Sequence, residues 1–246
     1  MILAVAGDSF LHGNELADYQ WNTLEGSHST FAALLANYNS LYLRSCARPG
    51  NSNDAVARQC IQHIEQLKIN RPGEKIFALV AWTFISRFEF PFESFTSSPT
   101  RPWACISANF QMNKPEVNNF AELFFKHIDT DQLQSLNTIK SILILQNYLD
   151  HNKIPYLFTL TDNIVTKHKD DILLKPYWDM IDFDKWFFFP PGTNSWETTE
   201  PRGFYQWALE NKYRIGKQQH PLEEAHQAAA ELMKEKFNEL VTKSLE

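Results

Sequence analysis

Two residues far apart in the chain have the chemistry of a nucleophile and a base. Ser9 lies in the sequence Gly7-Asp8-Ser9-Phe10, directly after an apolar run, and His220 precedes Pro221 and an amphipathic segment. A serine hydroxyl is weakly nucleophilic at neutral pH and needs an adjacent base such as histidine. The pair predicts attack of Ser9 on a carbonyl carbon, provided that the fold brings residues 9 and 220 together.

Attack on a carbonyl also requires donors that stabilise the oxyanion formed at the carbonyl oxygen. The turn at residues 47–54 contains Gly50 and leads into a helix. The backbone N–H groups of such a turn and of the helix N-terminus can bind a negatively charged group. Thr83 follows another apolar run and offers a hydroxyl group. Gly50 and Thr83 are therefore candidate oxyanion donors beside Ser9.

Apolar runs of strand length alternate with segments of helical period, which favours a parallel sheet with helices on both faces. The predicted strands are residues 1–6, 41–45, 75–81, 155–160 and 186–189. The predicted helices are residues 29–37, 54–68, 130–152 and 222–245, the second of them capped by Asn53 or Asp54. In such a sheet the carboxyl ends of the strands meet at one edge, where ligands bind.

Two irregular stretches, residues 84–119 and 190–216, interrupt this alternation. Long irregular segments in a compact domain are usually functional loops or lids, so we expect both beside Ser9 within one domain spanning 1–246. The first stretch is rich in aromatic residues, which would form either a platform for a sugar ring or an acyl group, or only the core of the insertion. These residues are Phe88, Phe90, Phe92, Phe95, Trp103 and Phe110.

Composition excludes several classes of protein. Hydrophobic residues make up 43% of the 246 residues and aromatic residues 14%, so a sizeable core is expected. The net charge of −6 argues against a general nucleic-acid-binding surface. The three cysteines, Cys46, Cys60 and Cys105, form no CxxC pair and are expected to be reduced. The histidines show no metal-binding spacing such as HExxH, so we expect no catalytic metal and no cofactor.

The sequence shows neither a secretory signal peptide nor an apolar run of the roughly 20 residues that a membrane span needs. We therefore expect a soluble cytoplasmic protein. If the protein is encoded by a phage, we also expect that it could associate with the virion. The expected partner is a small-molecule or carbohydrate ester substrate, with no nucleic acid and no membrane, and the oligomeric state is left open.

The spaced motifs resemble the GDSL/SGNH hydrolases, and the resemblance spans nearly the whole chain. Gly7-Asp8-Ser9-Phe10 resembles the first block of the family, which implies Ser9 as nucleophile and its own N–H as an oxyanion donor. Gly50 resembles the glycine of the second block, also an oxyanion donor, and Lys217-Gln218-Gln219-His220-Pro221 aligns with the Asp-x-x-His-Pro of the fifth. The resemblance implies a flavodoxin-like α/β/α sandwich with a five-stranded parallel sheet.

Two positions depart from the family pattern. Thr83, in Ala81-Trp82-Thr83-Phe84, stands where the family has an oxyanion-binding asparagine, and Lys217 stands where it has the aspartate that orients the histidine. Loss of such an acid can cost about 10⁴ in rate. A backbone carbonyl could orient His220 instead. So could an acid brought close by the fold, for which the candidates are Glu223, Glu224, Asp182 and Asp184.

Several residues have a second interpretation. Ser9 could simply cap a turn, and His226, rather than His220, could be the base. Arg87 could bind a substrate carboxylate or form an ion pair with Glu89 or Glu93. Asp8 is expected to support the serine turn. The candidate substrate-binding residues are Asp8, Asn51, Trp82 and Arg87.

The Trp82, Thr83 and Arg87 variant, followed by His-Pro-x-Glu-Glu-Ala-His near the end of the chain, is similar to a divergent branch found in phage and bacterial genomes. The sequence thus predicts a serine esterase that hydrolyses a small acyl ester, with a carbohydrate O-acetyl group as one candidate. One alternative is a binding or phage-associated structural protein that kept the fold and lost efficient chemistry. Another is an O-acyltransferase that uses the same residues.

Overall fold

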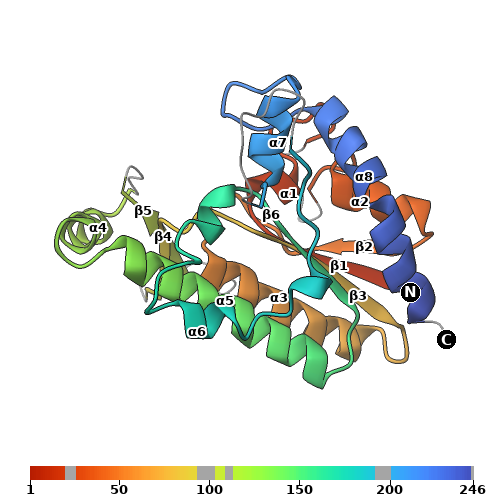
Figure 1. The fold of residues 1–246 in the computed structure, drawn as a ribbon, viewed down its shortest axis with the longest axis horizontal. Helices are drawn as coiled ribbons and strands as arrows, with labels where there is room; N and C mark the ends of the chain where they lie inside the picture. Colours follow the sequence, from red (N-terminus) through yellow and green to blue (C-terminus); the bar gives the residue numbers. More distant parts are fainter. Residues whose placement is uncertain (20–25, 93–102, 109–112, 192–200, 245–246) are drawn as a thin grey trace.

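Four short apolar segments form the central sheet of the computed structural model. The strands are β1 (Ile2–Ala6), β2 (Tyr42–Ser45), β3 (Ile76–Trp82) and β6 (Tyr156–Leu160). All pair in parallel, in the order β2-β1-β3-β6 (Figure 1). The structure describes residues 1–19, 26–92, 103–108, 113–191 and 201–244.

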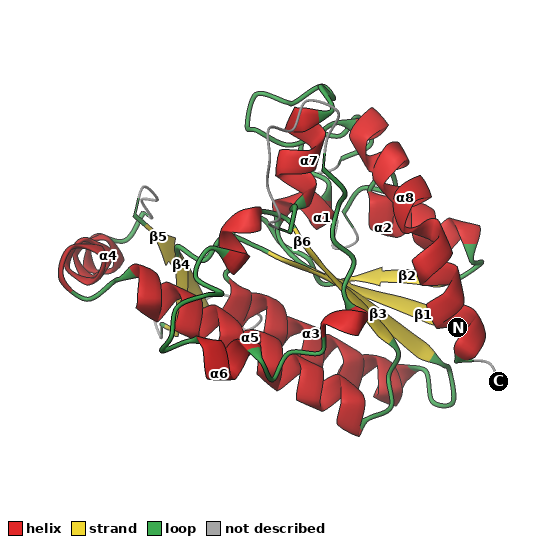
Figure 2. Cartoon of the chain, viewed as in Figure 1, coloured by secondary structure: helices red, strands yellow, loops and turns green. Residues whose placement is uncertain are grey.

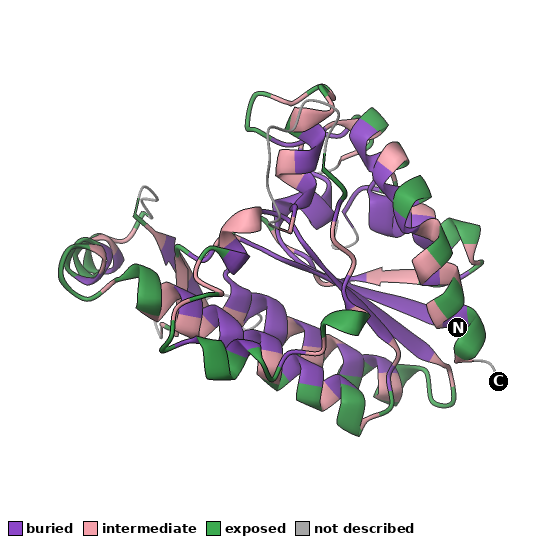
Figure 3. Cartoon of the chain, in the orientation of Figure 1, coloured by how far each residue is buried: buried purple, intermediate pink, exposed green. Residues whose placement is uncertain are grey.

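Alternate side chains of each strand enter different cores, as the period of two dictates. Ile2 and Ala4 of β1 face the cluster built on α3 (Asn53–Asn70) and α5 (Asp131–His151). Leu3 and Val5 face the opposite cluster, which contains side chains of three other helices. These helices are α2 (Phe31–Tyr38), α7 (Phe204–Glu210) and α8 (Glu223–Lys243). The result is the predicted three-layer arrangement of helices, sheet and helices, in which β1, β3 and β6 are buried and the edge strand β2 is partly exposed (Figures 2 and 3).

Three of the longer helices begin at hydroxyl residues that accept a hydrogen bond from an otherwise unpaired backbone N–H. Thr30, Ser52 and Thr130 cap α2, α3 and α5, each accepting from the N–H three residues later. The cap of α3 is therefore Ser52 rather than the expected Asn53 or Asp54, both of which lie inside the helix.

The sheet has four strands, so the predicted fifth strand at 186–189 is wrong. Trp186 makes only an isolated parallel bridge with Phe158, and Phe187 N–H donates to the Phe158 carbonyl at 2.8 Å. Phe189 then pairs with Arg202 in an antiparallel bridge instead of continuing along β6. The apolar pattern that suggested a strand reflects burial of Trp186 and Phe189, which are 2% exposed.

The first predicted insertion folds into regular elements of its own. It contains an antiparallel pair of strands, β4 (Arg87–Pro91) and β5 (Trp103–Ser107), and the start of α4 (Pro115–His127). Figure 1 shows this unit at one end of the molecule, beyond the central sheet. Its phenylalanines form a separate small core with Val117 and Ala121 of α4.

The remaining described elements are short. They are α1 (Ser9–His12), η2 (Asn163–Thr166), α6 (Lys175–Trp178) and η3 (Phe183–Lys185). The second predicted insertion contains α7, and its residues 192–200 lie outside the described part of the chain. Within the described ranges, none of the helices combines the length and the apolar character needed to cross a membrane. The expectation of one domain over residues 1–246 stays a prediction.

Candidate active site

Ser9 is the first residue of α1 and follows directly on the carboxyl end of β1. Asp8 caps α1: its backbone is extended, and its carboxylate accepts the N–H of Phe10 at 3.0 Å. A Cβ atom at Gly7 would lie 3.1 Å from Leu11 Cδ1, so a side chain there would crowd the turn. The local sequence thus forces a sharp strand-to-helix turn that holds Ser9 at the sheet edge.

His220 lies against Ser9, although the two residues are 211 positions apart in the chain. The distance from His220 Nε2 to Ser9 Oγ is 2.8 Å, a hydrogen-bonding distance. His220 stands two residues before the cap of α8, and its carbonyl accepts the Gly216 N–H at 2.7 Å. The ring of Phe10 packs on the imidazole with 4.9 Å between centroids. The fold therefore brings together the two groups that the sequence predicted as nucleophile and base.

A carboxylate that the sequence analysis missed completes this arrangement. Glu15 lies in the turn after α1, and its Oε2 is 2.8 Å from His220 Nδ1. The N–H groups of Gln218 and His220 donate to the same carboxylate, at 2.9 and 3.3 Å. Partial burial works to raise the pKa of Glu15, but these hydrogen bonds outweigh burial and hold the pKa below its ordinary value. The group is therefore an ionised carboxylate at neutral pH.

None of the acids expected to replace the missing aspartate makes this contact. Glu224 pairs with Arg214 at 2.8 Å, and Glu223 accepts the Ala17 N–H at 2.7 Å. Asp182 caps η3, and Asp184 lies within η3. The signal in the sequence was weak: Glu15 follows Gly13-Asn14, a turn sequence, only six positions after the serine.

His226, the alternative base, is held elsewhere. It is 1% exposed, and its Nδ1 accepts the Phe31 N–H at 3.1 Å. Burial lowers the pKa of His226 to about 3, so the imidazole is neutral. Its contacts are those of a structural histidine between α2 and α8.

The turn that carries Gly50 is tied to the strand end beside Ser9. The Arg48 N–H and the Asn51 side-chain amide both donate to the Gly7 carbonyl, at 3.2 and 2.9 Å. Gly50 has a left-handed backbone with φ of 78°, and no described atom lies within 4 Å of where its Cβ would be. On the other side Cys105 Sγ donates to the Gly50 carbonyl at 2.9 Å. Gly50 is thus fixed beside the serine turn with open space next to its Cα.

Thr83, Asp8 and Arg87 form one buried polar network. The Thr83 hydroxyl donates to Asp8 Oδ2 at 2.6 Å, and Arg87 Nη1 lies 3.0 Å from Thr83 Oγ1 and 3.2 Å from Asp8 Oδ2. Arg87 Nη1 also donates to the Asn51 carbonyl at 2.9 Å. In this arrangement the single hydroxyl proton of Thr83 points to Asp8, not to an oxyanion. Arg87 pairs with Asp8 rather than with Glu89, which pairs with Arg58.

Burial sorts the four predicted substrate-binding residues. Trp82 is 0% exposed and packs edge-on against Phe158 in the core, which leaves no surface for a substrate. Asp8 and Asn51 are 0% and 6% exposed and bond to protein groups. Arg87 keeps 19% of its side chain exposed, so it alone of the four has an appreciable surface toward solvent.

The aromatic residues of the first insertion mostly serve its own core. Phe88 stacks on Phe124 with 4.4 Å between centroids, and Phe90 packs against Phe120 at 4.8 Å. Phe92 packs against the same core, and Trp103 lies under the guanidinium of Arg58 at 4.5 Å. Phe95 and Phe110 lie outside the described residues. Two half-buried aromatic side chains, Phe84 and Tyr205, pack against Phe10, the residue after Ser9, at 6.3 and 6.0 Å between centroids.

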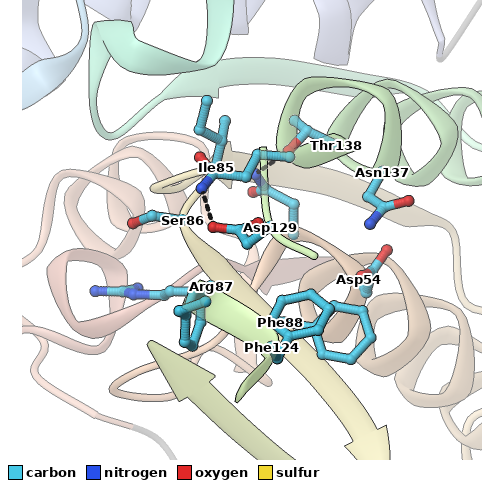
Figure 4. A pocket seen from close by; sticks show the side chains of 12 residues that line it. Asp54, Ile85, Ser86, Arg87, Phe88, Phe124, Asp129, Asn137 and Thr138 are labelled. Carbon is cyan, nitrogen blue, oxygen red and sulfur yellow. Dashed lines mark hydrogen bonds between the residues drawn. The ribbon is translucent and has the colours of Figure 1, made fainter. Parts of the chain in front are cut away.

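A small pocket opens between residues 85–88 and helices α3, α4 and α5, and neither Ser9 nor His220 lines it (Figure 4). Phe88 and Phe124 line one side of it, whereas Asp129, Asn137 and Thr138 line another. Burial raises the pKa values of Asp54 and Asp129 at its wall. Among the residues that the structure describes, no group of three or more His, Cys, Asp or Glu side chains is placed to hold a metal ion.

The three cysteines are free thiols. Burial raises the pKa of Cys46 to about 12 and that of Cys105 to about 11, so both are protonated at neutral pH. Burial likewise raises the pKa of Cys60 well above its ordinary value. None of the three is therefore an activated nucleophile.

Fold and site together define an α/β protein with a serine, a histidine and a carboxylate in hydrogen-bonded series at the carboxyl edge of a parallel sheet. The layered architecture that the GDSL/SGNH resemblance implies is confirmed, with four strands in place of five. No protein-family model matches the sequence, and no curated protein matches it either.

Several solved structures are similar to the chain. They include a psychrotrophic esterase, EstA, from Pseudoalteromonas sp., at 10% identity and a TM-score of 0.48, with 99% of this chain and 98% of that one covered. An acetyl xylan esterase, Est2A, from Butyrivibrio proteoclasticus has 13% identity and a TM-score of 0.46, with coverage of 98% and 63%. A G-D-S-L family lipolytic protein from Desulfitobacterium hafniense has 10% identity and a TM-score of 0.36, with coverage of 85% and 95%. These TM-scores lie below 0.5, so the likeness alone carries no argument about activity.

Proposed function

We propose that the protein is a serine esterase that cleaves a small acyl ester through Ser9 and His220. The observation that carries the proposal is the 2.8 Å contact between Ser9 Oγ and His220 Nε2. A base at this distance can accept the hydroxyl proton as the oxygen attacks, which turns a weak nucleophile into an effective one. Ser9 is 7% exposed at the sheet edge where open α/β folds bind ligands.

In the first half of the proposed reaction, Ser9 Oγ forms a bond to the acyl carbon while its proton passes to His220 Nε2. The carbonyl electron pair moves to oxygen, and the N–H groups of Ser9 and Gly50 are the proposed donors to that oxyanion. When the carbonyl re-forms, the ester C–O bond breaks and the leaving alkoxide takes the proton from His220. The products are an acyl-enzyme and an alcohol.

In the second half, His220 takes a proton from water, whose oxygen attacks the acyl carbon. Collapse of the second tetrahedral intermediate breaks the bond to Ser9 Oγ, and the proton returns from His220 to the serine. The carboxylic acid leaves and the free enzyme is restored. An acceptor alcohol in place of water would make the same residues an acyltransferase. A carbohydrate O-acetyl ester is a candidate substrate, since Phe84 and Tyr205 offer half-buried aromatic surface near Ser9.

The alternative of a binding protein without catalysis was motivated by Lys217 in the place of the acid. The carboxylate of Glu15 at His220 Nδ1 weakens that motive, because a carboxylate does stand beside the histidine. No observation on the described residues favours a second function.

Hydrolysis of aryl acetates and of O-acetylated sugars tests the proposal, with product analysis in the presence and absence of an acceptor alcohol. We expect Ser9→Ala and His220→Ala each to reduce turnover to a residual rate no more than about 10³–10⁴-fold above the uncatalysed reaction. Ser86→Ala is the matched control, because Ser86 is an exposed serine that follows β3. Ester hydrolysis that survives in Ser9→Ala at the parental rate would overturn the proposal.

A further inference from the structure

The Glu15 carboxylate contacts the imidazole of His220 on the nitrogen opposite Ser9. Oε2 lies 2.8 Å from Nδ1, and Nε2 lies 2.8 Å from Ser9 Oγ. A carboxylate accepts hydrogen bonds and cannot donate them when ionised, so this contact requires the proton of neutral His220 on Nδ1. That tautomer leaves the Nε2 lone pair free to accept the serine proton.

The same carboxylate also orders the segment that carries His220. The Gln218 N–H donates to both oxygens at 2.9 Å, and the His220 N–H donates to Oε2 at 3.3 Å. Glu15 and Gln219 both adopt left-handed backbones, with φ of 69° and 68°. Non-glycine residues rarely adopt this conformation, so the hydrogen bonds to the carboxylate help to hold the segment in place.

Gly216 leaves the space that the carboxylate occupies. A Cβ atom at Gly216 would lie 2.5 Å from Glu15 Cδ and 2.6 Å from both carboxylate oxygens, which is far closer than non-bonded atoms approach. The φ of Gly216 lies outside the left-handed region, so the backbone itself would accept alanine. Only a residue without a side chain at position 216 leaves room for the Glu15 carboxylate in its observed place.

We propose that Glu15 is the positioning residue of His220. In this chain Lys217 stands where the resembling family has the orienting aspartate, and Glu15, in the turn after α1, takes over that task. This inference deepens the proposed esterase and rests on it. Glu15 fixes the tautomer and ring orientation of His220 and stabilises the imidazolium that forms as Ser9 attacks. Lys217 is exposed and is not needed for this task.

Glu15→Gln tests the role with almost no change in shape. The amide oxygen can still accept the Gln218 N–H, but the amide nitrogen would face the N–H groups of His220, which favours the wrong tautomer. We expect kcat to fall about 10³–10⁴-fold with KM changed less than about threefold. Glu231→Gln is the matched control, because Glu231 is an exposed glutamate of α8 that interacts with Lys234 and with the Tyr38 hydroxyl. Retention of more than a tenth of the parental kcat in a folded Glu15→Gln variant would overturn the inference.

Gly216→Ala gives a second test that leaves the carboxylate in place. The added methyl must displace Glu15 from His220, so we expect kcat to fall about tenfold or more in the parent but to change little in the Glu15→Gln background. Such non-additivity is the mark of two residues acting through one contact. Additive losses would overturn the coupling.

A direct spectroscopic readout of the tautomer does not depend on activity. The ¹⁵N chemical shifts of His220 in the unmodified protein at pH 8 should show a protonated Nδ1 and an unprotonated Nε2, and Glu15→Gln should reverse them. A protonated Nε2 in the parent would overturn the inference even if the enzyme is active. If the tautomer is as expected but no ester is hydrolysed, the proposed function fails and the positioning role stands.

Discussion

At the level of single residues, two members of the proposed catalytic site can be recognised from local sequence and one cannot. Ser9 and His220 each carry a local signal, because one ends an apolar strand and the other precedes proline and a helix. Glu15 carries almost none, since its contact with His220 joins residues 205 positions apart. Local sequence therefore points to acids near the histidine, whereas the fold places a carboxylate from the serine side of the chain against His220.

Asp8 in the serine turn and Arg87 at the start of β4 form a largely buried ion pair at 3.2 Å. Replacement of Arg87 by Met would leave the fully buried Asp8 carboxylate with fewer partners. Because an uncompensated buried charge is costly, we expect the free energy of unfolding to fall by about 1–3 kcal/mol, as measured by urea denaturation. The control is Arg71→Met, which removes an exposed pair with Glu74 and should cost about 0.5 kcal/mol or less. Equal losses in the two variants would contradict a stabilising role for the buried pair.

At the scale of elements, the sequence predicted those strands and helices whose pattern is set by burial alone. Strands β1, β3 and β6 are buried along their length because helices cover both faces of the sheet, and all four strands lie within one residue of their predicted ranges. The sequence did not predict the hairpin β4–β5. Its apolar residues pack into a separate aromatic core with α4, so they do not follow the simple alternation of a strand with one buried face. The segment 186–189 was wrongly predicted as a strand. Its apolar residues are buried, but they form only isolated bridges and not a continuous run of strand pairing.

His226 gives the packing of α8 against α2 a dependence on pH. Burial lowers the pKa of His226 to about 3 in the folded protein, whereas an unfolded histidine titrates near 6.5. The unfolded chain therefore binds a proton first, and stability that is fully present above about pH 6.5 is lost as the pH falls toward 3. We expect His226→Asn to reduce the slope of unfolding free energy against pH by up to about 1.4 kcal/mol per unit between pH 6 and 5.

The measurement is urea unfolding of parent and variant at several pH values, with pH 8 as the internal control. Asparagine keeps an acceptor for the Phe31 N–H, so the two proteins should differ in slope more than in stability at pH 8. Parallel curves over the whole range would contradict the assignment of His226 as a buried neutral group.

At the scale of the whole molecule, two large cores flank the sheet and a third, smaller core belongs to the β4–β5–α4 unit. Phe124 is 6% exposed at its centre and stacks on Phe88. We expect Phe124→Ala to lower the free energy of unfolding of this unit by about 3 kcal/mol. In hydrogen exchange, the amides of β5 should lose protection while those of β1 and β3 stay protected. Leu123→Ala, on the exposed face of α4, should cost about 0.5 kcal/mol or less. Uniform loss of protection across the sheet would contradict the independence of this unit.

Covalent labelling tests the proposed activation of Ser9 by His220. A fluorophosphonate should modify the parent protein once, with the adduct mapped to Ser9 by mass spectrometry. His220→Ala should slow labelling by several orders of magnitude, and Ser9→Ala should abolish it. Absence of labelling in the folded parent, or an adduct at another residue that persists in Ser9→Ala, would contradict the account.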